Sequence, residues 1–118
     1  MRLSADEAKQ LLDKWATDKS PVRIAHIARS GYLAVAMSGT LWGLPPNDVA
    51  VKSFFSPDED CVTFRFTGCT FEYGDNREAP AHLRDYAKGK YESVVTILFP
   101  ESSERVYLFE LKSKPRQP

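Results

Sequence analysis

Hydrophobic and polar residues alternate most clearly on either side of Thr67 and Gly68. If the chain turns at this pair, one register places the apolar side chains on one face and the polar ones on the other. The polar face then brings Arg65 diagonal to Glu72. We therefore predict a β-hairpin over residues 61–73 with one buried face, in which Phe66 faces Cys69, Phe64 faces Phe71 and Val62 faces Tyr73.

An N-terminal helix is predicted over Ala5–Thr17. Ser4 and Glu7 have the spacing of a capping box, in which each side chain bonds the backbone N–H of the other residue. An apolar stripe at helical spacing follows, and Pro21 prevents the helix from continuing. The stripe consists of Ala8, Leu11, Leu12 and Trp15.

Short runs rich in β-branched and aromatic residues predict further strands. Gly39 falls inside one of them, which indicates a bulge or a bend there. The last two strands carry apolar residues on both faces, which is typical of central strands. A second short helix is predicted over residues 80–88, between Pro80 and Gly89. The further predicted strands cover residues 22–29, 32–42, 49–55, 92–99 and 105–111.

The predicted element order gives an α+β fold class and a single domain over residues 1–118. Consecutive strands joined by short turns pair in antiparallel fashion. We expect a mainly antiparallel bent sheet or a small, partly closed β-barrel of about seven strands. One helix is expected to cover an open end of this sheet.

The formal net charge is zero, with 16 basic and 16 acidic residues. Nucleic-acid-binding domains usually have a basic excess, so nucleic acid is disfavoured as a partner. Zero net charge favours self-association, and we expect a homo-oligomer. No apolar run is long enough to span a bilayer, and the N-terminus lacks the apolar region of a signal peptide, so no membrane association is expected.

The two cysteines, Cys61 and Cys69, are several residues apart along the predicted hairpin. That separation is too large for a disulfide, so we predict free thiols and a cytoplasmic location. Cys69 shares the apolar face and is expected to be an inert core thiol, whereas Cys61 is the more accessible of the two.

No catalytic or metal-binding motif occurs in the sequence. Zinc-site spacings of Cys and His, the G-x-S-x-G elbow and glycine-rich phosphate loops are all missing. No catalytic residue, metal ligand or cofactor can therefore be assigned.

Two groups of residues are candidates for binding. The apolar segment 41–46 contains Trp42, Leu44 and Pro45. We expect it to form a loop, and two interpretations stay open: its side chains pack into the core, or they form a docking surface. Arg23, His26 and Arg29, along the first predicted strand, are candidates for holding an anionic small-molecule ligand.

These observations leave two hypotheses for function. The first is a non-catalytic ligand- or partner-binding small barrel domain that acts as a homo-oligomer. The second rests on the order of a leading helix, antiparallel strands, a late helix and a closing hairpin. That order resembles the flavin-binding split barrels, which would imply a small cofactor-dependent enzyme. No residue pattern transfers from that family to this chain.

Overall fold

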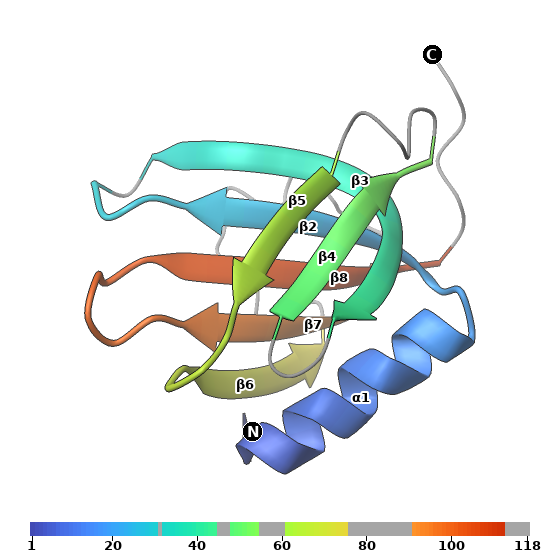
Figure 1. Cartoon of the computed structure of the whole chain (residues 1–118), viewed down its shortest axis with the longest axis horizontal. Helices are drawn as coiled ribbons and strands as arrows, with labels where there is room; N and C mark the ends of the chain where they lie inside the picture. Colours follow the sequence, from blue (N-terminus) through green and yellow to red (C-terminus); the bar gives the residue numbers. More distant parts are fainter. Residues whose placement is uncertain (31, 45–47, 55–60, 76–90, 113–118) are drawn as a thin grey trace.

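The computed structural model describes residues 1–30, 32–44, 48–54, 61–75 and 91–112. These residues form an α+β fold with one helix and eight strands (Figure 1). The predicted strands are present, with ends that differ by no more than two residues among the described positions. The elements are β1 (Arg2–Leu3), α1 (Ala5–Thr17), β2 (Pro21–Ile27), β3 (Leu33–Leu44), β4 (Asp48–Ser53), β5 (Cys61–Arg65), β6 (Thr70–Asp75), β7 (Tyr91–Leu98) and β8 (Arg105–Leu111).

All eight strands belong to one antiparallel sheet, in the order β1-β6-β7-β8-β2-β3-β4-β5. Strands β1 and β5 lie at the two ends of this order, so the sheet is open. The prediction of a bent antiparallel sheet is confirmed. The alternative of a small, partly closed barrel is wrong, because the end strands β1 and β5 do not pair with each other in the described part of the chain. The eight strands found there are close to the expected number of about seven.

The predicted hairpin is correct at its turn and wrong beyond it. The N–H of Cys69 donates to the carbonyl of Phe66 at 3.1 Å, and Gly68 has a φ of 77°, a backbone conformation that favours glycine. However, β5 pairs with β4, and β6 pairs with β7 and β1. Strand β1, which was not predicted, pairs with β6 and places Leu3 opposite Phe71. It therefore occupies the edge of β6 with which β5 would pair in a continuous hairpin.

The inward orientation of the hairpin's apolar residues is nevertheless confirmed. Phe66 and Phe71 are buried, and their rings meet edge to face with centroids 5.7 Å apart. Val62, Phe64 and Tyr73 are half-buried against the same core. The interior of the sheet thus keeps the predicted side chains although the strands that carry them separate after the turn.

Helix α1 begins and ends at the predicted residues. The Ser4 side chain accepts from the N–H of Glu7 at 3.1 Å, and the Glu7 carboxylate accepts from the N–H of Ser4 at 2.9 Å, which completes the capping box. Ala8, Leu12 and Trp15 are buried. The helix contacts β3 as well as β1 and β6, so it bridges parts of the sheet that are far apart in the strand order.

The main core lies inside the folded sheet. Figure 1 draws β4 and β5 in front of β2 and β8, and residues of β2, β4, β7 and β8 all belong to one buried cluster with the helix. Two parts of the sheet therefore face each other across this cluster. Its members outside the helix are Val22, Ile24, Leu41, Val49, Val51, Phe66, Phe71, Val95, Ile97, Val106 and Leu108.

A second buried cluster lies on the opposite face of β2, β7 and β8. The pairing of β7 with β8 shifts between Tyr91 and Ser93, and this bulge lets Tyr91 share a face with Val94. Strands β7 and β8 are thus apolar on both faces and central in the order, as predicted. The cluster consists of Ala25, Tyr91, Val94, Tyr107, Phe109 and Leu111, with Ile27 packed against it.

Strand β3 turns the corner between the two parts of the sheet, and Figure 1 shows it curving strongly. Its first part pairs with β2 and its second part with β4, and only Gly39 and Thr40 pair on both sides. The bend predicted at Gly39 is confirmed. Residues 41–44 continue this strand, so the prediction that they begin a loop is wrong.

The predicted second helix, at residues 80–88, lies outside the described residues. Among the residues that are described, no helix has the length and apolar character that crossing a lipid bilayer requires.

Candidate functional site

Trp42 lies on the outer surface of the sheet, opposite the main core. Its neighbour Leu41 belongs to the inner cluster, so strand alternation directs Trp42 outward, and the residue is 50% exposed. The interpretation in which Trp42 is a core residue is therefore wrong. Leu44 is the last residue of β3, and Pro45 lies outside the described residues.

Lys52 covers part of the Trp42 ring. Its Nζ lies 4.3 Å from the ring centroid, which is the geometry of a cation–π contact. Trp42 itself pairs with Ala50, and Thr40 pairs with Lys52. The Ala50 side chain is only 1% exposed, whereas the indole beside it is half-exposed and forms part of the outer surface of the sheet.

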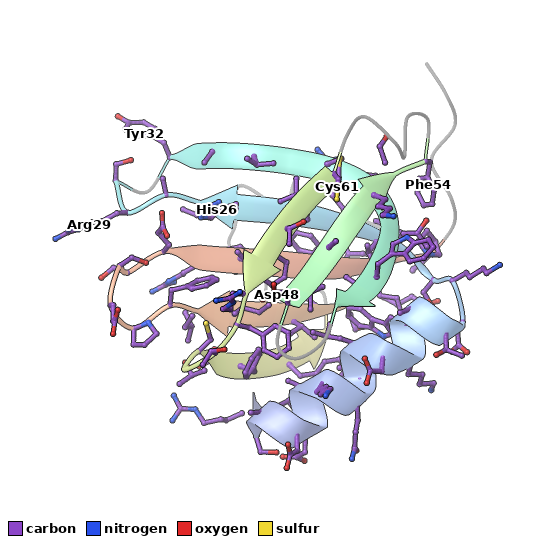
Figure 2. The ribbon with its side chains drawn as sticks, in the orientation of Figure 1. His26, Arg29, Tyr32, Asp48, Phe54 and Cys61 are labelled. Carbon is purple, nitrogen blue, oxygen red and sulfur yellow. The ribbon has the colours of Figure 1, made fainter. Side chains whose placement is uncertain are left out.

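We call this surface the β3–β5 outer face. The register of the three strands arranges it in rows, with Thr40, Lys52 and Cys61 in the first and Trp42, Ala50 and Thr63 in the second. Asp48 and Arg65 occupy the third. Figure 2 shows Cys61 and Asp48 toward opposite ends of the β4–β5 pair.

The third row contains an ion pair. Nε of Arg65 donates to Oδ1 of Asp48 at 2.9 Å, and this hydrogen bond, with the negative charge of Asp48, raises the pKa of Arg65. The Arg65 side chain is 72% exposed, so solvent screens the pair and it contributes little to folding stability. This contact replaces the diagonal pair predicted between Arg65 and Glu72, because β1 places Arg2 opposite Glu72.

The three residues predicted to hold an anion do not meet on one face. Val22 and Ile24 point into the main core, so alternation along β2 directs Arg23 outward and His26 inward. Nη1 of Arg23 donates to Oγ of Ser38 at 3.0 Å. Arg29 follows β2, and Figure 2 shows it and Tyr32 projecting away from the sheet.

His26 instead lies beside a carboxylate at the end of the sheet. Its Nε2 is 3.7 Å from Oε1 of Glu104, and Oγ of Ser102 donates to Oε2 of Glu104 at 3.1 Å. A serine nucleophile needs the imidazole between its hydroxyl and the acid. Here the acid lies between the other two groups, so the arrangement does not favour removal of the Ser102 proton.

Both cysteines are free thiols, with Cys61 exposed and Cys69 half-buried. Burial raises the pKa of Cys69, which lowers the thiolate fraction of that residue at neutral pH. The predicted order of accessibility is confirmed. Within the described ranges, no three His, Cys, Asp or Glu side chains gather as a metal ion would require.

Sequence reasoning missed Lys52, Asp48 and Glu104 as neighbours of the candidate residues. The register of β3 on β4 carries the signal for Lys52, since residues two apart on one strand face the same side. Fixing that register requires knowing that β3 continues to Leu44. Glu104 approaches His26 only because β8 pairs with β2, a contact between distant parts of the chain.

No known family, curated protein or solved structure matches this chain.

Proposed function

We propose that this chain is a non-catalytic binding domain that acts as a homo-oligomer, and that the β3–β5 outer face is where a second copy docks. The observation that carries the proposal is the half-exposed Trp42 on the β3–β5 outer face. Tryptophan is enriched among the residues that dominate interface energies, because its large rigid ring buries much area at a small entropy cost.

The chemistry of the surface also supports binding over catalysis. Its polar groups are an ammonium, an ion pair, hydroxyls and a thiol, and none is arranged as a nucleophile with its base. Zero net charge removes long-range repulsion between copies. A cytoplasmic location belongs to the same proposal, because an exposed thiol such as Cys61 persists best in a reducing compartment.

Replacing Trp42 by Ala tests the proposal. We expect self-association, measured by sedimentation across a range of concentrations, to weaken at least tenfold. Because the ring is only half-buried, unfolding should become easier by about 1–2 kcal/mol at most. Trp15→Ala is the matched control: this side chain is 3% exposed, and its loss should cost about 3–5 kcal/mol.

Two results would contradict the proposal. The first is a wild-type chain that sediments as a monomer at every concentration. The second is a Trp42→Ala variant that associates as strongly as the wild type.

The alternative, a cofactor-dependent enzyme of the flavin split-barrel type, has weaker support. Its anion-holding residues would be Arg23, His26 and Arg29, and they lie on different faces or project into solvent. A flavin present at a hundred times its Kd would stabilise the fold by about 2.7 kcal/mol, so a thermal-shift screen is sensitive. A clear shift with a flavin would favour this alternative.

A further inference from the structure

We infer that two copies pack their β3–β5 outer faces about a twofold axis that passes beside Ala50, so that Asp48 of each copy faces Lys52 of the other. This inference rests on the proposed function and specifies the geometry of docking. It follows from the distribution of charge along β4.

The outward positions of β4 are Asp48, Ala50 and Lys52, as their register with β3 and β5 requires. The two opposite charges are equally far from Ala50, at about 7 Å each along the strand. A twofold axis that lies in the interface and crosses β4 at Ala50 therefore exchanges the acidic position with the basic one. The surface is complementary in charge to a copy of itself.

Two twofold orientations can bring such faces together, and the charges choose between them. If the axis runs along β4, Asp48 faces Asp48 of the second copy and Lys52 faces Lys52, so both contacts repel. If the axis is perpendicular to β4, the two β4 strands stack in antiparallel fashion and both contacts attract. Juxtaposing like charges across an interface is strongly unfavourable, so the second orientation is favoured.

The side chains have the reach that this packing needs. Sheets that stack face to face lie about 10 Å apart, a gap that a short acidic and a long basic side chain span together. The bond from Arg65 uses Oδ1 of Asp48. Oδ2 of the same carboxylate is then available to Lys52 of the second copy, whose ammonium group would leave the Trp42 ring of its own chain to reach it. Asp48 would then lie between two cations.

The same operation places Trp42 opposite Trp42 of the second copy. The two half-exposed rings would remove each other from water, whereas the Ala50 side chain between the charged positions is already covered within each copy. Three strands of about five residues present roughly 240 Å² in projection. Standard interfaces bury about 800 Å² per partner, so we expect a weak dimer whose population depends on concentration.

A charge-exchange experiment tests this geometry. Asp48→Lys and Lys52→Asp each convert the two attractive contacts into repulsive ones, so each variant alone should dimerise at least tenfold more weakly than the wild type. Mixed in equal amounts, the two variants restore opposite charges at both contacts. Sedimentation of the mixture should therefore show a heterodimer that high salt weakens.

Glu101→Lys is the matched control, because Glu101 is exposed, lies in the turn between β7 and β8, and undergoes the same change of charge. This variant should dimerise like the wild type. Unfolding curves identify any variant that is monomeric because it no longer folds. For such a variant, Asp48→Asn or Lys52→Gln should still weaken dimerisation by severalfold.

The outcomes separate the two proposals. If the wild type associates and depends on Trp42, but neither charge variant weakens dimerisation, the twofold geometry is refuted and the proposed function stands. A mixture of the folded charge variants that stays monomeric also refutes the geometry. A wild type that never associates refutes both proposals.

Discussion

Gly39→Ala should destabilise the fold strongly, because β3 approaches the backbone of β4 more closely at this residue than a side chain permits. A Cβ atom at Gly39 would lie 1.9 Å from the carbonyl oxygen of Lys52, whereas real Cβ contacts essentially never fall below 3.0 Å. The difference is 1.1 Å, and it must come from displacement of one strand, since the obstructing atom belongs to the backbone.

The expected loss in the free energy of unfolding follows from the backbone pairs between β3 and β4 that such a displacement disturbs. Gly39 with Ser53 and Thr40 with Lys52 are the first two pairs of β3 with β4. Backbone hydrogen bonds span about 2.7–3.2 Å, so a shift of this size breaks them, at about 1–3 kcal/mol for each buried group left unsatisfied. The lower entropy of an unfolded chain with alanine offsets about 0.4–1 kcal/mol. We expect a net loss of about 2–4 kcal/mol.

Gly43→Ala is the control within the same strand. Of the described atoms, its Cβ would meet only Oδ1 of Asp13, at 3.4 Å, and Gly68 is the only described glycine with a positive φ. Alanine should therefore be neutral at Gly43 or stabilising by up to about 1 kcal/mol. Urea unfolding followed by circular dichroism compares the two variants. If their free energies of unfolding agree within about 0.5 kcal/mol, the close approach of β3 to β4 does not exist in solution.

Further predictions concern the helix cap and the thiols. Ser4→Ala removes the acceptor for the N–H of Glu7 and should cost about 1 kcal/mol in chemical unfolding; an unchanged stability would mean that the cap does not form. Hydrogen bonds from the backbone N–H and the side chain of Ser4 lower the pKa of Glu7 below its ordinary value of 4.5. The ionised carboxylate thus stabilises the fold above that pH, and the contribution is lost as pH falls through the lower folded-state pKa. Between about pH 6 and pH 3, the melting temperature of Glu7→Gln should consequently fall less than that of the wild type. An equal fall in both proteins would contradict the capping geometry. In a thiol titration at neutral pH, Cys61 should react fast and Cys69 slowly, because burial raises the pKa of Cys69. Two equally fast thiols, or a fast phase that survives Cys61→Ser, would contradict this order.

The parts of the fold that sequence reasoning predicted correctly depend on local signals. The capping box between Ser4 and Glu7 and the apolar stripe that follows fix the helix without reference to the rest of the chain. Apolar residues on both faces predict that β7 and β8 are central strands, and the two strands pair with each other across a short turn. In each case the residues that carry the signal lie close together in the sequence.

The predicted pairing of β5 with β6 is wrong because β1 competes with β5 for the same edge of β6. A turn at Gly68 is compatible with a continuous hairpin, and the alternation on both sides of it supports one. What separates β5 from β6 is β1, a strand of two residues that binds the edge of β6 through Leu3 and Phe71. So short a segment has no periodicity from which a strand could be predicted. The same pairing also left Arg65 available for Asp48.

Trp42 departs from the pattern of the sheet around it, and this departure is the strongest reason to connect the surface with function. On the β3–β5 outer face, the described neighbours of Trp42 are the buried Ala50 and polar or charged residues, and the latter suit a solvated face. An indole at such a position contributes less to the core than a buried one, and it exposes apolar area to water. Natural sequences break a local rule of this kind mainly where function requires it.

Replacing Trp42 by Thr restores the polar pattern of this face, since threonine suits an exposed strand position. If the ring serves only the fold, this variant should be less stable with self-association unchanged. If the ring serves docking, self-association should fall while stability stays within about 1–2 kcal/mol of the wild type.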